Sequence, residues 1–367
     1  MIPLGFELGT GAPIAIPRGH LAITGQSQAS GKTTTLEGLV SRAGCRAIAF
    51  VTKRGEGSFR VASPIPPYFK DRTDWPFVRT ILEATAGEKL KFERAQIMNL
   101  CQDYEGPEGK WDAPKTLADV LQNAERALFV PDPSWKKIEG VAAPLVPNKH
   151  CRGFVRNVYT VLVEYLREVV PEIERLPYTK TLELASGLNV MDLTSYTFPL
   201  QALVVRSVIE FVGSRGQSTI TVIPEAWKFA PKMRNSPVRM AAEELIRQGA
   251  ALRNFLWCDS QDLAGISSVL LRQVTVWLFG VQRDPREIER TLEHIPADQA
   301  KPNKRDIATL GRGEFIVSFE RQLYRVYVQP AWMTPAHAEA IARGEESVES
   351  AREIVRDFDL EHGEVGR

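Results

Sequence analysis

Residues 21–35 read Leu21-Ala-Ile-Thr-Gly-Gln-Ser-Gln-Ala-Ser-Gly-Lys-Thr-Thr-Thr35, an apolar run that changes into a loop of small and polar residues. This order predicts a β-strand, a phosphate-binding loop and the start of a helix. In such a loop consecutive backbone N–H groups surround a phosphate, and Lys32 would reach the β- and γ-phosphates. The N-terminal end of the helix favours an anion at the same place. The stretch therefore predicts a site for ATP and Mg²⁺, with the hydroxyl of Thr33 on the metal.

The loop is one residue longer than usual. Gly25 and Gly31 enclose five residues, where the usual loop has four, and Ala29 stands where a third glycine is common. A Gly-Lys-Thr that merely opens a helix is the alternative, but the apolar run before the loop favours a nucleotide site. The residues expected to bind the nucleotide are Gly25, Gln28, Ser30, Gly31, Lys32, Thr33 and Thr34.

Size and composition are those of an ordinary globular protein. A chain of 367 residues suits one large domain or two moderate ones. Its net charge of +1 means that any contact with nucleic acid has to come from local patches. The four cysteines are widely spaced and form no CxxC pair, which favours reduced thiols over a disulfide frame or a zinc site. Because neither a signal peptide nor a membrane-spanning stretch is evident, we expect a cytoplasmic protein.

The pattern of apolar runs and helical periodicity divides the chain into three parts. We expect an α/β core in residues 1–56 and 186–333, a mainly helical insertion in residues 57–185, and a charged C-terminal helix and tail in residues 334–367. The core strands are expected at 20–24, 45–51, 188–193, 219–223, 255–258, 274–279, 314–319 and 323–328, with a turn at Arg321-Gln322. The core helices are expected at 32–42, 199–212, 237–248 and 285–293.

Polar residues follow two of these strands. Glu225 comes directly after the strand at 219–223, and Gln261 follows the strand at 255–258. Because open α/β sheets bind ligands at the carboxyl ends of their parallel strands, we expect both side chains near the phosphate loop. A carboxylate at Glu225 can orient or deprotonate the water that attacks a γ-phosphate, and Gln261 can sense that phosphate. Ordinary solvent-exposed strand ends are the alternative for both residues.

In this order the segments resemble the FtsK–HerA family of hexameric DNA-pumping P-loop ATPases, and the HerA branch in particular. The resemblance covers roughly residues 4–56 and 186–330. The matching motifs are Arg18-Gly-His-Leu-Ala-Ile-Thr-Gly25, Thr52-Lys-Arg-Gly-Glu56, Gly187-Leu-Asn-Val-Met-Asp-Leu193, Pro224-Glu-Ala-Trp227, Ser260-Gln261 and Leu310-Gly-Arg-Gly-Glu-Phe-Ile-Val317. The resemblance implies an α/β, RecA-like P-loop NTPase fold of the ASCE type and a homo-oligomeric, hexameric ring.

The chain also departs from the family pattern. Pro224 replaces the aspartate that holds a Mg²⁺-bound water in the family, and Thr52 replaces the acidic residue of the second strand's turn. Asp192 or Asp259 would have to supply a substitute carboxylate. The family's N-terminal β-barrel is not expected, because the sequence opens almost directly on the core. ATP binding is therefore better supported than ATP hydrolysis.

The resemblance also implies an arginine that reaches the γ-phosphate of a neighbouring subunit. Counting back from Gln261 gives Ala250 at that place, so we consider Arg253 first and Arg247 second. Contacts to the DNA backbone, without base reading, are expected from a basic cluster after Glu225. Its members are Lys228, Lys232, Arg234 and Arg239, with Lys53 and Arg54 as further candidates. Solvated surface charge is the alternative for all of these residues.

These expectations favour an ATP-dependent DNA translocase or helicase-type motor of the HerA class. It would act as a ring on duplex DNA, with a nuclease or another effector as partner, because no nuclease residues cluster in this sequence. Two alternatives stay open. One is a nucleotide-bound hexameric scaffold that hydrolyses ATP weakly or not at all and recruits a partner. The other is a coupling or packaging ATPase of a mobile element or virus.

Overall fold

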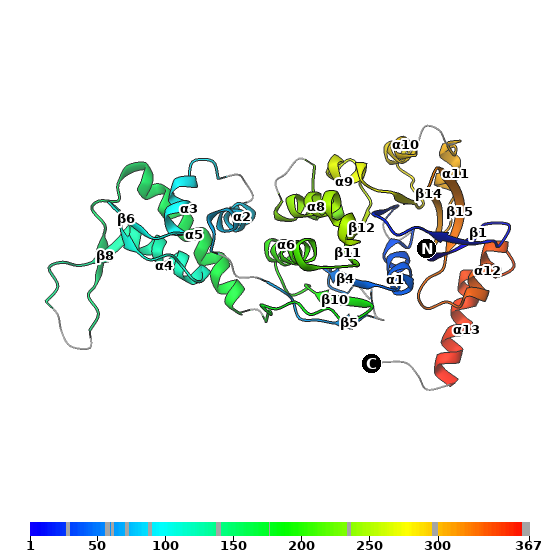
Figure 1. Cartoon of the computed structure of the whole chain (residues 1–367), viewed down its shortest axis with the longest axis horizontal. Coiled ribbons are helices and arrows are strands. Elements are labelled where there is room, and N and C mark those ends of the chain that lie inside the picture. Colours follow the sequence, from blue (N-terminus) through cyan, green and yellow to red (C-terminus); the bar gives the residue numbers. More distant parts are fainter. Residues whose placement is uncertain are drawn as a thin grey trace.

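The computed structural model describes residues 1–26, 30–55, 59, 62–69, 73–86, 90–136, 141–175, 177–232, 236–295 and 300–361. Within these residues one large sheet has the strand order β2-β1-β15-β14-β13-β3-β12-β11-β4-β10-β5 (Figure 1). The strands are β1 (Ile2–Glu7), β2 (Pro13–Ile16), β3 (Leu21–Thr24), β4 (Arg46–Val51), β5 (Ser63–Pro64), β10 (Leu188–Asp192), β11 (Thr219–Ile223), β12 (Phe255–Ser260), β13 (Val276–Phe279), β14 (Glu314–Phe319) and β15 (Gln322–Val328).

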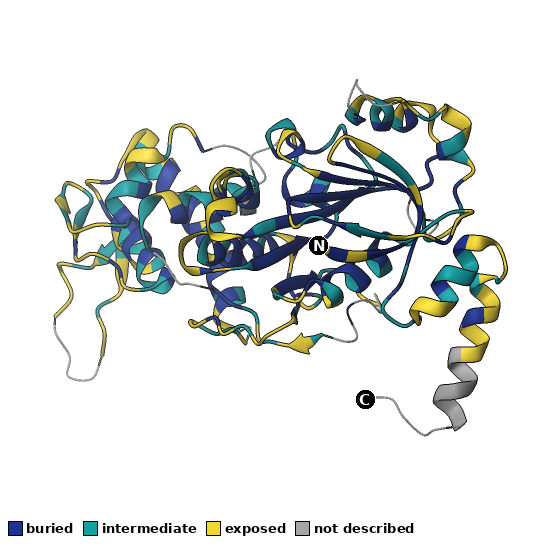
Figure 2. Cartoon of the chain, turned by 45° about the vertical axis from the view of Figure 1, so that its right-hand side comes forward, coloured by how far each residue is buried: buried dark blue, intermediate teal, exposed yellow. Residues whose placement is uncertain are grey.

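The strands from β13 to β5 are parallel, and β14, β15, β1 and β2 extend the sheet in antiparallel fashion. Every residue of β3 and β11 is buried, as expected for parallel strands that are covered on both faces (Figure 2). Although β3 and β4 follow each other in the core sequence, β12 and β11 lie between them. The strand ends that carry the predicted polar residues therefore come side by side.

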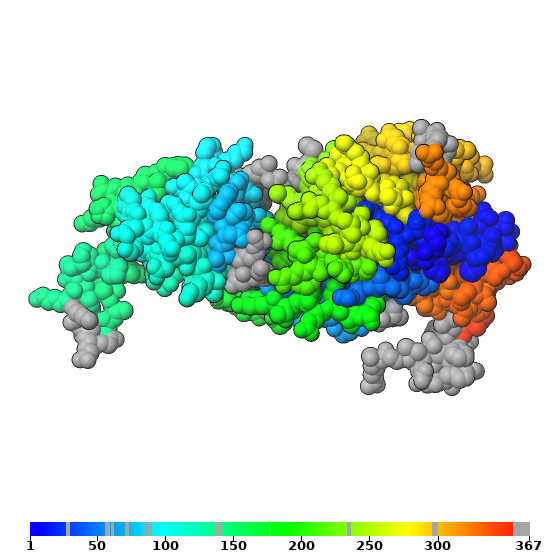
Figure 3. Space-filling view, viewed as in Figure 1, coloured from blue at the N-terminus to red at the C-terminus, as the bar shows by residue number. Residues whose placement is uncertain are grey.

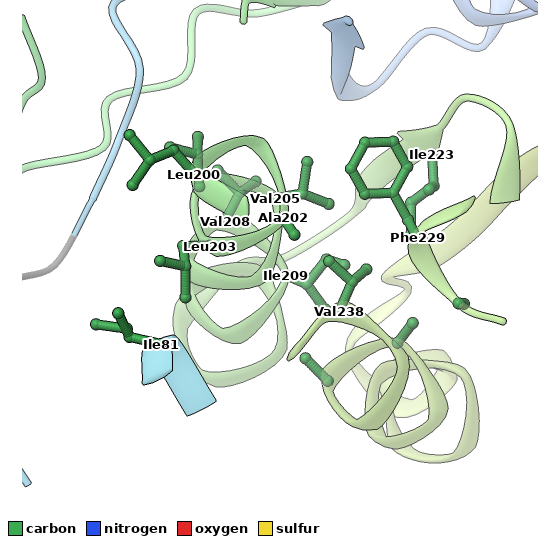
Figure 4. Close-up of a cluster of buried hydrophobic side chains, with 14 of the residues drawn as sticks. Ile81, Leu200, Ala202, Leu203, Val205, Val208, Ile209, Ile223, Phe229 and Val238 are labelled. Atoms are coloured by element: carbon green, nitrogen blue, oxygen red, sulfur yellow. The ribbon is translucent and has the colours of Figure 1, made fainter. Parts of the chain in front are cut away.

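Helices cover both faces of this sheet. On one face α1 (Lys32–Arg42) packs Leu36 and Leu39 into a cluster with alternate residues of the strands. On the other face lie α6 (Phe198–Arg215) and α8 (Pro237–Gln248). Figure 4 shows the apolar side chains of α6 between Ile81 and Val238, which belong to α2 (Trp75–Ala86) and α8. This packing holds the parallel strands between two apolar layers.

The segment between β5 and β10 is mainly helical. It contains α2, α3 (Arg94–Leu100), α4 (Leu117–Leu128) and α5 (Gly153–Arg175), and two small hairpins, β6–β7 (Tyr104–Gly106 and Gly109–Trp111) and β8–β9 (Phe129–Pro131 and Leu145–Pro147). Figures 1 and 3 show it as a lobe at one end of an elongated molecule. Its buried side chains belong to the same apolar cluster as those of α6 and α8. The division into a core and an insertion stays a prediction.

The remaining helices lie around the sheet and after it. They are α7 (Ala226–Phe229), the 3₁₀ helix η1 (Gly249–Leu252), α9 (Ser268–Arg272), α10 (Pro285–His294), α11 (Lys304–Ala308), α12 (Pro335–Arg343) and α13 (Val348–Glu361). Helix α12 buries Ala338 and Ala342 with Tyr327 of β15. Among the helices that the described ranges contain, none combines the length and apolarity needed to cross a bilayer.

Two buried side chains fix β12 beside β3. The Nδ1 atom of His20 accepts a hydrogen bond from the backbone N–H of Leu256 (3.1 Å), and Trp257 donates its indole N–H to the carbonyl oxygen of Gly19 (3.0 Å). Burial lowers the pKa of His20 to about 4, so the ring stays neutral at pH 7. The resulting register places Asp259 opposite Ile23.

Several predicted boundaries differ from the structure by one to three residues, among them those of β12 and of the last turn. Strand β12 runs two residues further than expected, to Ser260, so that Asp259 lies within the strand. The last turn is centred on Glu320 and Arg321, which have φ values of 47° and 62°, whereas Gln322 already belongs to β15. Positive φ at both central residues matches the twist of a two-residue hairpin, which explains the shift by one residue.

Candidate nucleotide site

The phosphate loop connects the buried end of β3 to the start of α1, as the sequence predicts. Gly31 has φ 74° and ψ 27°, a left-handed conformation that glycine adopts without a steric penalty. At Gly25 a Cβ atom would lie 2.6 Å from Ser30 Oγ, so the close return of the loop leaves no room for a side chain. The Ser30 hydroxyl donates to the carbonyl oxygen of Gln26 (2.9 Å) and closes this turn. The predicted contact residue Gln28 lies outside the described residues.

Helix α1 provides an anion site at its first turn. Among the described residues, no side chain caps this turn and none of its own residues is acidic. The first N–H groups of an α-helix have no partner within the helix and carry the positive end of its dipole. Thr33 and Thr34, the two predicted contact residues after Lys32, are half-buried in this turn. The geometry is therefore suitable for a phosphate group over residues 31–34.

Lys32 is a buried cation at this place. Only 9% of the residue is exposed, and its Nζ donates a hydrogen bond to the carbonyl oxygen of Gly25 (2.7 Å). Burial lowers the pKa of Lys32, whereas the negative charges of Asp259 and Glu225 act in the opposite direction. An ammonium group has three donors, so donors beyond the one bonded to Gly25 can turn to phosphate oxygens.

Glu225 follows β11 and holds an unusual backbone conformation, with φ 47° and ψ 54°. Its N–H donates to Oδ1 of Asp259 (3.0 Å), and its carboxylate forms ion pairs with Lys53 and with Lys228, the latter at 2.5 Å. Burial opposes ionisation of Glu225, but hydrogen bonds and charge from the two lysines outweigh it and lower the pKa. A non-glycine residue with positive φ at a site is a strained conformation that the surroundings must hold in place.

Asp259 lies in β12, between the strand that leads into the phosphate loop and the strand that leads into Glu225. It is 5% exposed. Burial raises the pKa of its carboxyl, and the positive charge of Lys32 opposes that rise. Because Cys258 pairs with Ile223, Asp259 is level with Pro224, one strand closer to the loop. Gln261 follows the same strand and is half-buried.

Asp192 and Asp259 are the two carboxylates that could replace the aspartate missing at Pro224, and the structure places them far apart in the sheet. Asp192 ends β10 and is exposed, and it accepts a hydrogen bond from the N–H of Thr194 (2.9 Å). Three strands, β4, β11 and β12, stand between β10 and β3. Only Asp259, of this pair, lies beside the phosphate loop.

Arg312 is a residue near the loop to which the sequence pattern gave no role. A Cβ atom at Gly31 would lie 3.8 Å from Arg312 Cγ, and the N–H of Gly313 donates to the carbonyl oxygen of Ser30 (3.4 Å). In the sequence, the two glycines that flank Arg312 in the segment 310–317 indicate a tight loop at this place. A tight loop that carries an arginine thus contacts the phosphate loop from the side of β14.

Arg247 and Arg253 lie away from Lys32 in the same chain. Arg247 lies in the last turn of α8, and Arg253 is the C-terminal cap of η1, two residues before β12 begins. Both are exposed and lie toward the amino ends of the parallel strands, the edge opposite the phosphate loop. Their contact with a neighbouring subunit stays a prediction.

The structure uses two residues of the predicted basic cluster in internal contacts. Lys228 pairs with Glu225, and Arg239 pairs with Glu243 (2.8 Å) and donates to the carbonyl oxygen of Lys232 (2.8 Å). The side chain of Lys232 is exposed, and Arg234 lies outside the described residues. DNA contact by this cluster stays a prediction.

A metal ion here would depend on the nucleotide. In the part of the chain that the structure describes, no group of three or more His, Cys, Asp or Glu side chains could hold an ion by itself. Magnesium in nucleotide sites is commonly bound through phosphates, water and one or two protein oxygens. The donor set present, the hydroxyl of Thr33 and the carboxylate of Asp259, has this chemistry.

Comparisons with known proteins identify the fold. No protein-family model matches the sequence, and no curated protein does. Among solved structures, VirB4 of Thermoanaerobacter pseudethanolicus aligns with a TM-score of 0.64 and 15% identity, over 90% of this chain and 96% of that one. An unbound bacterial conjugative coupling protein, TrwBΔN70, aligns with a TM-score of 0.55 and 12% identity, over 88% of both chains. The plasmid coupling protein TrwB in complex with ADP and Mg²⁺ gives 0.52 and 13%, over 85% of both chains.

At such identities the likeness concerns the fold. The large mixed sheet with helices on both faces matches that of VirB4 and TrwB, and the predicted fold class is confirmed. The chain has the fold of the VirB4 and TrwB structures, an α/β fold of the RecA-like P-loop type.

Proposed function

We propose that this chain binds ATP with Mg²⁺ and works in a homo-oligomeric ring, a hexamer, as an ATP-dependent motor on duplex DNA. The observation that carries the proposal is the convergence of Lys32, Asp259 and Glu225 at the carboxyl ends of three strands, next to the N-terminus of α1, which no side chain of the described residues caps. Lys32 and the loop amides would hold the phosphates, and Glu225 would orient the attacking water. Gln261 would contact the γ-phosphate, and Arg253 or Arg247 would reach it from the neighbouring subunit.

Asp259 would take the place of the family aspartate that is proline at position 224. It lies level with Pro224 on the neighbouring strand, and its carboxylate is near enough to Lys32 to act on the charge of that side chain. With Thr33 it would hold Mg²⁺, which neutralises phosphate charge when it is bound. This assignment supports hydrolysis despite the loss of the usual aspartate.

Mg²⁺ is expected to raise the affinity for the nucleotide. Replacing Asp259 with asparagine is expected to reduce this Mg²⁺-dependent increase by about tenfold. The asparagine keeps an oxygen that can accept the N–H of Glu225 but loses the charge that attracts the cation. Calorimetry of ADP binding with and without Mg²⁺ measures this gain. Pro224→Asp in the same chain is expected to restore it, and the exposed Asp192→Asn is the matched control. An unchanged Mg²⁺ dependence in Asp259→Asn contradicts the assignment.

The form of the motor has two candidates. A HerA-class translocase with a nuclease or effector partner follows from the resemblance of the motifs. A coupling ATPase of a mobile element is favoured by the conjugative coupling protein and VirB4 among the structural neighbours. A match over 90% of the chain also includes much of residues 57–185, which make up about a third of it.

Phosphate release from ATP tests the proposal, and we expect duplex DNA to stimulate the steady-state rate several-fold. Light scattering after size exclusion, with and without ATP, is expected to show a hexamer. Binding of ATP without any turnover would contradict the motor and favour a nucleotide-bound scaffold. A monomer under all conditions would contradict the ring.

A further inference from the structure

The carboxylate of Glu225 is held by two lysines that come from distant parts of the chain. Lys53 lies in the loop after β4, and Lys228 lies in α7, three residues after Glu225. We propose that Lys53 and Lys228 form a binding site for the phosphodiester backbone of DNA, which Glu225 fills as an internal anion until DNA replaces it. The inference rests on the proposed function. It adds that DNA binding to the two lysines releases the Glu225 carboxylate, which can then act on the nucleotide.

The contacts have the geometry of a phosphate site. One carboxylate oxygen, Oε1, pairs with Lys53, and the other, Oε2, lies 2.5 Å from Nζ of Lys228. Two ammonium groups therefore approach two oxygens of one anionic centre, as they would approach the two non-bridging oxygens of a phosphodiester. Lysine binds phosphate as a point charge and does not require a fixed fork geometry.

Exposure shows from which side DNA would approach. The side chains of Lys53 and Lys228 are 47% and 35% exposed, whereas that of Glu225 is 13% exposed. The lysines thus face solvent and the carboxylate lies beneath them. Ion pairs with such exposure are weak, so that a second anion can compete for the lysines. Two positive charges on one negative charge leave an excess of positive charge, and the exposed Arg54 follows Lys53 directly.

Release of the carboxylate would leave Glu225 in place to act on the nucleotide. Its backbone N–H is held by Asp259 (3.0 Å), so the residue stays fixed beside the strand that borders β3. The charges of both Glu225 and Lys53 act on the pKa of Lys32, in opposite directions, in keeping with an ion pair close to the phosphate loop. While both oxygens pair with lysines, the carboxylate is a weaker base, as the lowered pKa indicates.

Binding of a fluorescent DNA duplex, followed by anisotropy over a range of salt concentrations without nucleotide, tests the site. Lys53→Gln with Lys228→Gln is expected to weaken binding about tenfold at low salt. The slope of log affinity against log salt should become less steep by about 0.9, because the two lysines together neutralise one phosphate. Glu225→Gln is expected to strengthen binding about threefold, since it removes the competing anion. Lys304→Gln, which removes an exposed lysine paired with Glu289 (2.6 Å), is the matched control and should change nothing.

Phosphate release provides a second readout, because a merely structural pair of lysines would not raise the rate when removed. In the double lysine variant, phosphate release without DNA is expected to become nearly as fast as the DNA-stimulated release of the wild type. Added DNA should then no longer change the rate. An unchanged affinity and salt slope in the double variant would overturn the inference. Weaker ATP binding with intact DNA binding would also overturn it, because the lysines would then serve the nucleotide.

The two proposals fail in different ways. A wild-type protein that binds ATP, and whose DNA affinity is insensitive to both lysines, contradicts the lysine site alone. A wild-type protein that binds DNA through the lysines but has no affinity for ATP contradicts the proposed motor and supports the DNA site. Binding of RNA with the same lysine dependence but no binding of duplex DNA overturns the choice of partner. No binding of any nucleic acid overturns both proposals.

Discussion

Replacing Lys32 with alanine is expected to weaken ATP binding by about a hundredfold or more. Hydrogen bonds to charged groups contribute about 1.5–3 kcal/mol each, and about 1.4 kcal/mol corresponds to tenfold in affinity. Two such bonds from the ammonium group to phosphate oxygens therefore account for an effect of this size. Lys32 is also 9% exposed, so water cannot replace these contacts easily. Isothermal calorimetry with ATP or a slowly hydrolysed analogue measures the change.

A control for folding is needed, because Lys32 is a buried charge beside a buried carboxylate. Without it, the pKa of Asp259 should rise further, since the positive charge of Lys32 opposes the effect of burial. Thermal unfolding of both proteins shows whether the variant is folded at the temperature of the titration. Lys304→Ala is the matched control on the surface. Undiminished affinity in a folded Lys32→Ala protein would show that no triphosphate lies over this loop.

The elements around the phosphate loop could be predicted from the sequence because they are local. Helix α1 begins at Lys32 and ends at Arg42, as expected, since an apolar run, a glycine and a helical sequence follow one another directly. Strand β11 likewise has the expected ends, because all five of its residues are apolar or β-branched and all are buried. Signals of this kind depend on neighbouring residues alone.

The order of the strands could not be obtained in the same way. That β12 and β11 stand between β3 and β4 depends on contacts between residues far apart in the chain. This order decides that Asp259, and not Asp192, is beside the phosphate loop. The pairing of Lys53 with Glu225 joins residues 172 positions apart, and no local pattern predicts it. Sequence patterns predicted the residue types that a nucleotide site needs. The strand order determines which of those residues lie close together.

Replacing Glu225 with glutamine is expected to reduce ATP hydrolysis by about a hundredfold or more and to leave ATP binding intact. A positioned general base contributes roughly 10²–10⁴ in rate, and the amide cannot accept a proton from water. The glutamine keeps the size of the side chain, and the backbone N–H that donates to Asp259 is unaffected. Phosphate release at saturating ATP, with and without duplex DNA, measures the rate, and calorimetry measures the affinity.

The same variant separates a catalytic role of Glu225 from a structural one. A residue that only neutralises Lys53 and Lys228 would, when replaced, change DNA binding but leave the rate of phosphate release at saturating ATP unchanged. A catalytic carboxylate held by those lysines predicts a lower rate, unchanged ATP affinity and stronger DNA binding in one protein. Glu244→Gln, on the exposed side of α8, is the matched control and should alter none of the three. A rate of phosphate release equal to that of the wild type would show that Glu225 takes no part in the reaction.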